Sequence, residues 1–295
     1  MDIFRSGQTE VIHMLLKESL RQTGFILKQR EAGFTLTVLF WIVLWNYLKN
    51  VVTFQGLDMS QMYEPVKLLT LSYNKTYYDA DTVLLFTMLY PLLVPLAAGL
   101  SYAKEQQTKE EVFLTARLGK EHYMQTKLLS VFLATVLVFT LPFLVEILIT
   151  CVSFPSDAHG DLTNLSIYSQ EYAEMVHRYP ACMVYMVSPV LYAVLGTFLF
   201  GICSGIMAAF TAAVSFCFSI KYRVLLFFPS FLLLNSTLYL NELFSTGSRQ
   251  ISWYEYLLLF NDNRKFCWYL PAAAAFLFLA VIGLYEIGKR QERYG

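Results

Sequence analysis

Charged residues are scarce in this chain of 295 residues: Asp, Glu, Lys and Arg make up only 15% of it, whereas hydrophobic residues make up 56%. The mean hydropathy is correspondingly high, at +0.48. Soluble globular domains carry about 25% charged residues, so this composition excludes an ordinary soluble domain and predicts an integral membrane protein. The formal net charge is zero. It points to no nucleic-acid partner, and we expect none.

Cysteines are few and follow no regular framework. The five are Cys151, Cys182, Cys203, Cys217 and Cys267. None forms a CxxC motif, and all lie in or beside apolar segments, where thiols behave as small apolar residues. A bridge between Cys151 and Cys182 on the outer side stays open as an alternative, although spacing alone does not favour it.

Catalytic and cofactor motifs are also missing. The chain has no phosphate-binding loop, since Gly119-Lys120 is followed by Glu121 and Leu114 stands where the first glycine belongs. None of the four histidines makes an HExxH motif. Glu171, Glu174 and His177 share one helix face, but this spacing is more typical of a solvated amphipathic helix than of a metal site. We therefore expect no catalytic residues, metal or cofactor in this chain.

Six apolar segments are long enough to cross a hydrocarbon core, which requires about 20 residues each. They cover residues 33–54, 83–103, 128–153, 190–220, 224–240 and 266–288. The fourth exceeds the length of one crossing, so we expect it to be tilted or broken, with an interfacial piece at 185–189 before it. The sequence thus predicts an all-α membrane protein with one transmembrane domain over residues 1–295.

Lysine and arginine are distributed unevenly between the two sides of this arrangement. One side, with the N-terminus, holds fifteen: Arg5, Lys17, Arg21, Lys28, Arg30, Lys104, Lys109, Arg117, Lys120, Lys127, Lys221, Arg223, Lys289, Arg290 and Arg293. The other side holds seven: Lys49, Lys67, Lys75, Arg178, Arg249, Arg264 and Lys265. Because excess positive charge stays cytoplasmic, we expect both termini in the cytoplasm.

The first 32 residues form a cytoplasmic lead-in without a cleavable signal pattern. Ile12, Leu16 and Leu20 fall on one helical stripe, while charged residues such as Lys17 and Arg21 face elsewhere. This pattern predicts an amphipathic helix along the inner membrane surface. Packing of the same helix on a cytoplasmic partner is the alternative.

Within the spans, a few residues are candidates for special roles. Glu146 is the one clear ionisable side chain inside a predicted span, and such groups default to functional hypotheses; a place in a translocation path and a simple interfacial position both stay open. Pro91 and Pro95, one turn apart, kink the second span in a way that suits a conduit. Gly201 and Gly205 form a GxxxG stripe for close helix packing, within the chain or at a dimer seam.

The most informative segment is the charged stretch from Ser101 to Lys127, between the second and third spans. It starts with a charged run and continues as a helix over 110–118, with Val112 and Phe113 near one face and Gly119 as its stop. A second helix start at Lys120 leads into the third span. A short amphipathic helix between two helix ends is suited to docking in a groove of another protein.

This arrangement resembles the integral-membrane permease subunits of ABC-2 type exporters. In that family an acidic residue follows the second span, a short coupling helix meets the ATPase, and an aromatic residue and then a lysine precede the third span. The residues in corresponding places are Glu105, Arg117, Tyr123 and Lys127. The lead-in, the turn at 221–223 followed by Pro229, and the aromatic segment 253–260 also match, whereas the outer loop 154–179 is longer than in the simplest members.

The resemblance implies a permease half that pairs with a second permease, identical or different, and with two cytoplasmic ABC ATPase subunits that bind ATP and Mg²⁺. It also implies export of an amphiphilic cargo, such as a peptide, lipid or drug, across a bacterial plasma membrane. The residues that would couple to the ATPase are Glu105, Thr108, Glu110, Glu111, Phe113, Arg117 and Lys120. The alternative is a membrane enzyme or an immunity or resistance protein that acts without an ATPase.

Overall fold

The computed structural model describes residues 2–58, 62–72, 88–156, 181–218, 223–244, 258–260 and 269–291. Within these residues the chain is helical, apart from connecting turns and an isolated bridge between Ser72 and Leu259. The α-helices are α1 (Asp2–Leu27), α2 (Arg30–Phe54), α4 (Ser101–Thr108), α5 (Glu110–Leu118), α6 (Lys120–Ser153), α9 (Cys182–Val187), α10 (Pro189–Cys217), α11 (Phe227–Phe244) and α13 (Tyr269–Gln291). Shorter turns are η2 (Pro65–Leu68), η3 (Pro95–Gly99) and η4 (Arg223–Leu226).

Three of these helices, α2, α6 and α10, are long and apolar enough to cross a membrane. Two shorter apolar helices, Met88–Gly99 and Val224–Ser236, lie within the predicted second and fifth spans. The expected all-helical, membrane-type architecture is therefore confirmed at this level. A short separate helix, α9, lies before α10 and ends at an extended Ser188, so it overlaps the piece expected at 185–189, whose interfacial position stays a prediction.

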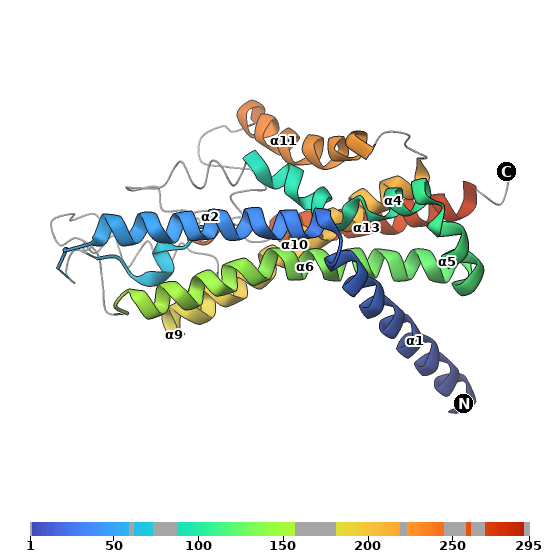
Figure 1. Ribbon diagram of the computed structural model, residues 1–295, viewed down its shortest axis with the longest axis horizontal. Coiled ribbons are helices and arrows are strands. Elements are labelled where there is room, and N and C mark those ends of the chain that lie inside the picture. Colours follow the sequence, from blue (N-terminus) through green and yellow to red (C-terminus); the bar gives the residue numbers. More distant parts are fainter. Residues whose placement is uncertain are drawn as a thin grey trace.

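Helices α2, α6, α10 and α13 run along the long axis of the molecule, and α1 leaves them at an angle (Figure 1). Helix α10 packs against both α6 and α13. Aromatic rings fill the centre: Phe200 of α10 makes edge-on contacts with Phe139 and Phe143 of α6. The start of α1, the end of α13 and helix α5 all lie at the same end of the bundle (Figure 1).

The glycine stripe of α10 lies against α6. A Cβ atom on Gly201 would come within 2.1 Å of Thr140 Oγ1, and one on Gly205 would come within 2.8 Å of a Phe132 ring carbon. Side chains larger than hydrogen at these positions would hold the two helices apart. The close approach therefore joins helices within this chain.

The second apolar segment changes its helical geometry before it reaches the charged stretch. Pro95 begins a π-helical turn, η3, that ends at Gly99. Pro95 lacks the amide hydrogen that a regular helix needs at this position, which favours such a local change. Gly99 packs closely on α10, where an added Cβ would lie 3.2 Å from Thr211 Cβ.

Helix α1 packs on α6 through residues other than its leucine stripe. The buried side chains are Ser19, Thr23 and Ile26, which lie on the side facing α6. Leu16 and Leu20 of the predicted apolar stripe are exposed. The small hydroxyl residues allow close packing on α6, and the leucines are left for the surroundings of the bundle.

Candidate functional site

Helix α5 is a separate rigid element between two sharp backbone turns. Lys109, which joins α4 to α5, has a φ of 60°. Gly119, which joins α5 to α6, has a φ of 77°. A positive φ is costly for lysine and easy for glycine. The helix thus has the bounds expected from the sequence, and it changes direction at both ends.

A buried ionic cluster connects α4 to the start of α6. The carboxylate of Glu105 accepts a hydrogen bond of 2.6 Å from Lys127 Nζ and one of 2.5 Å from the Tyr123 hydroxyl. Lys127 is 1% exposed, so its charge is compensated almost entirely by protein groups. Removing one member of such a pair leaves an uncompensated buried charge. The cluster therefore holds these two helices in one relative position.

Helix α5 is tied to the same cluster through Tyr102. The Tyr102 hydroxyl donates a 2.7 Å hydrogen bond to Glu111 of α5. The Tyr102 ring stacks at a tilt on the ring of Tyr123, with their centroids 6.3 Å apart. Leu114 and Leu118 on the inner face of α5 pack against this aromatic group. A displacement of α5 would therefore act on both α4 and α6.

Ion pairs extend the connection to the N-terminal helices. Arg117 of α5 lies 3.7 Å from Glu18 of α1, which also pairs with Arg21 at 3.6 Å. Lys104 of α4 donates to both carboxylate oxygens of Glu31 of α2, each at 2.9 Å. These pairs are partly exposed, so each contributes little to stability. Together these pairs fix the orientation of α1, α2 and α4 around α5.

A polar cleft of about 400 Å³ lies between α1 and the α4–α5 segment. Its lining residues are Glu18, Arg21, Gln22, Phe25, Gln29, Glu105, Glu110, Leu114, Arg117 and Leu118. Three of the predicted coupling residues, Glu105, Glu110 and Arg117, thus line one cleft. Carboxylates and guanidinium groups alternate around it, so it has no single charge preference for a small ligand.

The outer face of α5 is apolar and unburied. Val112 is 65% exposed and Phe113 is 78% exposed. They stand on a helix whose opposite face, with Leu114 and Leu118, packs on the bundle. Large exposed apolar side chains next to charged ones are typical of an interaction site.

Two further predicted coupling residues lie at the ends of the neighbouring helices. The Thr108 hydroxyl, at the end of α4, donates to the carbonyl of Lys104 at 3.1 Å. Lys120 is half-buried at the first position of α6. Next to it, Glu121 pairs with Lys289 of α13 at 2.9 Å, and this hydrogen bond raises the pKa of Lys289.

Glu146 lies in a second polar site, toward the opposite end of α6. Its side chain is 1% exposed. One carboxylate oxygen accepts hydrogen bonds from the Asn46 amide at 2.8 Å, the Thr70 backbone N–H at 2.8 Å and the Thr70 hydroxyl at 2.7 Å. The group therefore binds protein donors on α2 and on the segment 62–72, rather than interfacial water.

The segment 62–72 is held over this end of the bundle by several contacts. Asn46 and Asn50 each donate to the Leu68 carbonyl, at 2.9 and 2.8 Å. The Leu259 N–H donates to the Leu71 carbonyl at 2.8 Å, which joins the segment to residues 258–260. Glu146 is thus the central acceptor that attaches the segment 62–72 to the helices.

The other candidates for a translocation path lie apart from these polar groups. Pro91 and Pro95 are buried, and their neighbours Leu93, Val94 and Ala97 belong to the main hydrophobic core. They shape the second apolar segment through its π-helical turn.

Cys151 and Cys182 both hold free thiols. The group Glu171, Glu174 and His177 lies outside the described residues, as do most of 253–260 and the turn at 221–222.

Sequence reasoning missed several of the partners. Tyr102 and Glu18 contact the coupling candidates Glu111 and Arg117, and Asn46 and Thr70 complete the Glu146 site. Asn46 carried a usable signal, because an amide inside an apolar span requires a partner. Thr70 carried none, since it lies in a connecting segment outside the apolar runs.

Among the described residues, no group of three His, Cys, Asp or Glu side chains is placed to hold a metal ion. Comparison of the chain with protein-family models, with curated proteins and with solved structures finds no match. The function is therefore inferred from the residues and their geometry.

Proposed function

We propose that this chain is the permease subunit of an ATP-driven exporter of the ABC-2 type, and that α5 is its coupling helix. The observation that carries the proposal is the construction of α5. Its outer face presents Val112 and Phe113 to solvent, while its inner face is attached to α4 and α6 by Leu114, Leu118 and Glu111. A helix that only linked two spans would not need both an exposed apolar face and buried ionic anchoring.

In this proposal the exposed face of α5 docks in a groove of a cytoplasmic ABC ATPase subunit. Helix-in-groove recognition uses a few apolar anchors on one face, and Phe113 is the largest such anchor on α5. Arg117 and Glu110 flank this face and supply charges at the rim. ATP and Mg²⁺ are bound by the partner, and this chain performs no hydrolysis.

Movement of the ATPase is transmitted through the buried cluster. A displacement of α5 acts on Tyr102 through its hydrogen bond with Glu111. From Tyr102 the displacement passes to the ion pair formed by Glu105 and Lys127. The turns at Lys109 and Gly119 allow α5 to tilt without unwinding α4 or α6. The displacement then travels along α6 and the second apolar segment, which line the path with a second permease subunit.

The six-span arrangement, with both termini and α5 in the cytoplasm, follows from the lysine and arginine distribution. The described helices support it to the extent that α2, α6 and α10 have the length and composition of membrane spans. An amphiphilic cargo, such as a peptide, lipid or drug, suits the apolar and aromatic interior. The location would be a bacterial plasma membrane.

Site-specific photo-crosslinking tests the proposal. A benzophenone amino acid replaces Phe113 in the full-length chain, which is expressed with a candidate ABC ATPase subunit. The control carries the same group at Val152, which is 87% exposed at the other end of α6. We expect an adduct with the ATP-binding subunit from position 113 only. Equal adducts from both positions, or none from 113 in a membrane-inserted chain, would contradict the docking role.

A further inference from the structure

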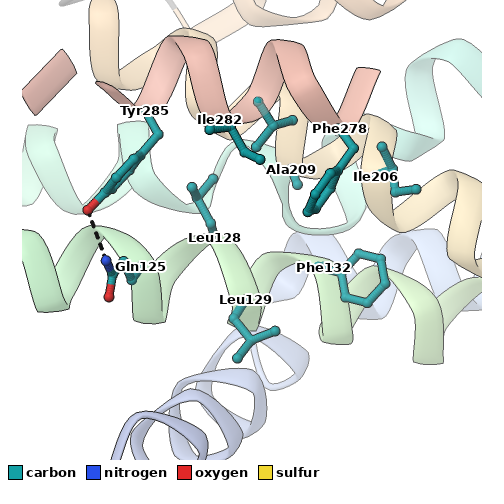
Figure 2. A pocket seen from close by; sticks show the side chains of 10 residues that line it. Gln125, Leu128, Leu129, Phe132, Ile206, Ala209, Phe278, Ile282 and Tyr285 are labelled. Carbon is teal, nitrogen blue, oxygen red and sulfur yellow. Dashed lines mark hydrogen bonds between the residues drawn. The ribbon is translucent and has the colours of Figure 1, made fainter. Parts of the chain in front are cut away.

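An apolar groove of about 410 Å³ runs between α6 and α13. Figure 2 shows side chains of α13 facing side chains of α6 across it, with α10 behind. Its lining residues are Gln125, Leu128, Leu129, Phe132, Ile206, Ala209, Phe278, Val281, Ile282 and Tyr285. All but Gln125 and Tyr285 are purely hydrocarbon side chains. Pockets of about 300–1,000 Å³ are the size that holds a small molecule.

The groove has a polarity gradient along its length. At one end Glu121 of α6 pairs with Lys289 of α13 at 2.9 Å. One turn further, Gln125 donates a 3.1 Å hydrogen bond to the Tyr285 hydroxyl. Beyond this bond the lining residues of both helices are aliphatic or aromatic, ending at Phe132 and Phe278 (Figure 2).

Helix α10 forms the floor of the groove and sets the space between α6 and α13. Helix α10 packs on both α6 and α13, so it holds them in place from behind. Ala209 contributes the smallest side chain of the lining, beside Ile206. Gly288 also lets α13 approach α10, since a Cβ there would lie 3.2 Å from Phe216 Cβ. The space between α6 and α13 is therefore set by contacts with α10, and no ring or aliphatic group of α10 fills it.

The two bridges decide which occupant fits. A membrane-spanning helix is about 10 Å across and continues past both ends of such a groove, but the Gln125–Tyr285 bond and the Glu121–Lys289 pair cross the groove at one end. An acyl chain is narrower, and it stops at its headgroup. Along the groove the order is an ionic pair, then a polar pair, then a hydrocarbon slot. A phospholipid has the same order of headgroup, glycerol and tail.

We propose that this groove binds one acyl chain of a phospholipid from the adjacent membrane leaflet. The glycerol region lies beside Gln125 and Tyr285, and the tail extends to Phe132 and Phe278. At the polar end, Lys289 of α13, which pairs with Glu121, is the cation that would face the phosphate of the headgroup. The inference requires the membrane placement proposed above, but it does not require an ATPase.

Photo-crosslinking with a defined lipid tests the site. The full-length chain is reconstituted in vesicles of phosphatidylcholine with a small fraction of phosphatidylglycerol whose acyl chain carries a diazirine. After illumination, mass spectrometry of peptides locates the adducts. We expect them to concentrate on residues 128–132 and 278–282 and to fall about tenfold on substitution Ala209→Phe, because the new ring fills the groove. Substitution Leu195→Phe, at an exposed position of α10 outside the groove, is the control.

The other results of this crosslinking experiment show which part of the proposal is wrong. Adducts spread evenly over exposed apolar positions such as Leu148, and insensitive to A209F, would show an ordinary lipid contact and overturn the proposal. A vesicle-bound chain with no lipid adduct on the groove residues would show that another occupant fills the groove and would overturn it too. A chain that does not stay with the vesicles would overturn both this proposal and the membrane placement. A groove-specific adduct in a chain that engages no ATPase would support the lipid site alone.

Discussion

Lys127 and Glu105, which are 22 residues apart in the chain, form a 2.6 Å ion pair in which the lysine side chain is 1% exposed. The pair joins the end of the second apolar segment to the start of α6, across the whole of α5. Because breaking one side of a buried pair leaves the other charge uncompensated, the two residues should be coupled energetically.

The first prediction concerns this coupling. Substitution Lys127→Met should destabilise the protein by about 3 kcal/mol, because Glu105 is left without its partner. Substitution Glu105→Gln should be damaging for the same reason. The double variant should be much less affected than the sum of the two, as in a double-mutant cycle. The measurement is the free energy of unfolding in detergent, and additive effects would argue against a coupled pair.

The second prediction concerns the attachment of the segment 62–72. Glu146→Ala removes the acceptor of the Thr70 amide, so hydrogen exchange at that amide should be about tenfold faster or more. Glu146→Gln keeps a carbonyl acceptor and should change the rate less. The control is Thr135→Val, since the hydroxyl of buried Thr135 bonds only to the Val131 carbonyl among the hydrogen bonds described. Equal exchange in E146A and the native protein would show that Glu146 does not hold the segment.

The third prediction concerns the contact between α6 and α10. Gly201→Ala places a methyl group 2.1 Å from Thr140 Oγ1, and overpacking of this kind costs about 1–3 kcal/mol. Adding Thr140→Ala removes the hydroxyl and should recover much of the loss. Gly33→Ala, where nothing lies within 4 Å, serves as the comparison. The thermal unfolding midpoint distinguishes these variants, and a loss that T140A does not relieve would place the clash elsewhere.

The local features of α5 could be predicted from the sequence. Glu110 and Glu111 favour a helix start, Gly119 favours its end, and the structure has a helix over these residues. Such signals work because capping and helix-dipole effects act over a few residues. The apolar runs likewise predict the long helices, since length and hydropathy suffice to define them.

The contacts between distant segments could not be predicted in this way. Nothing near Glu146 in sequence indicates Asn46 or Thr70, which are 100 and 76 residues away. The residues through which α1 packs on α6 could not be predicted for a similar reason. Its leucine stripe has the regular spacing, but Ser19 and Thr23 are the residues that fit closely against α6. Packing between helices depends on the shape of both partners, and a pattern on one helix describes only one of them.

The most direct test of the central claim is the ATP turnover, in membranes, of a candidate ABC ATPase subunit co-expressed with this chain. Substitutions Val112→Ala and Phe113→Ala together remove the exposed apolar face of α5 and leave Leu114, Leu118 and Glu111 in place. We expect chain-dependent ATP hydrolysis to fall about tenfold or more, because anchors of this kind dominate docking, whereas Val152→Ala should have no effect. Unchanged assembly and unchanged turnover in the α5 variant would contradict the role of α5 as a coupling helix.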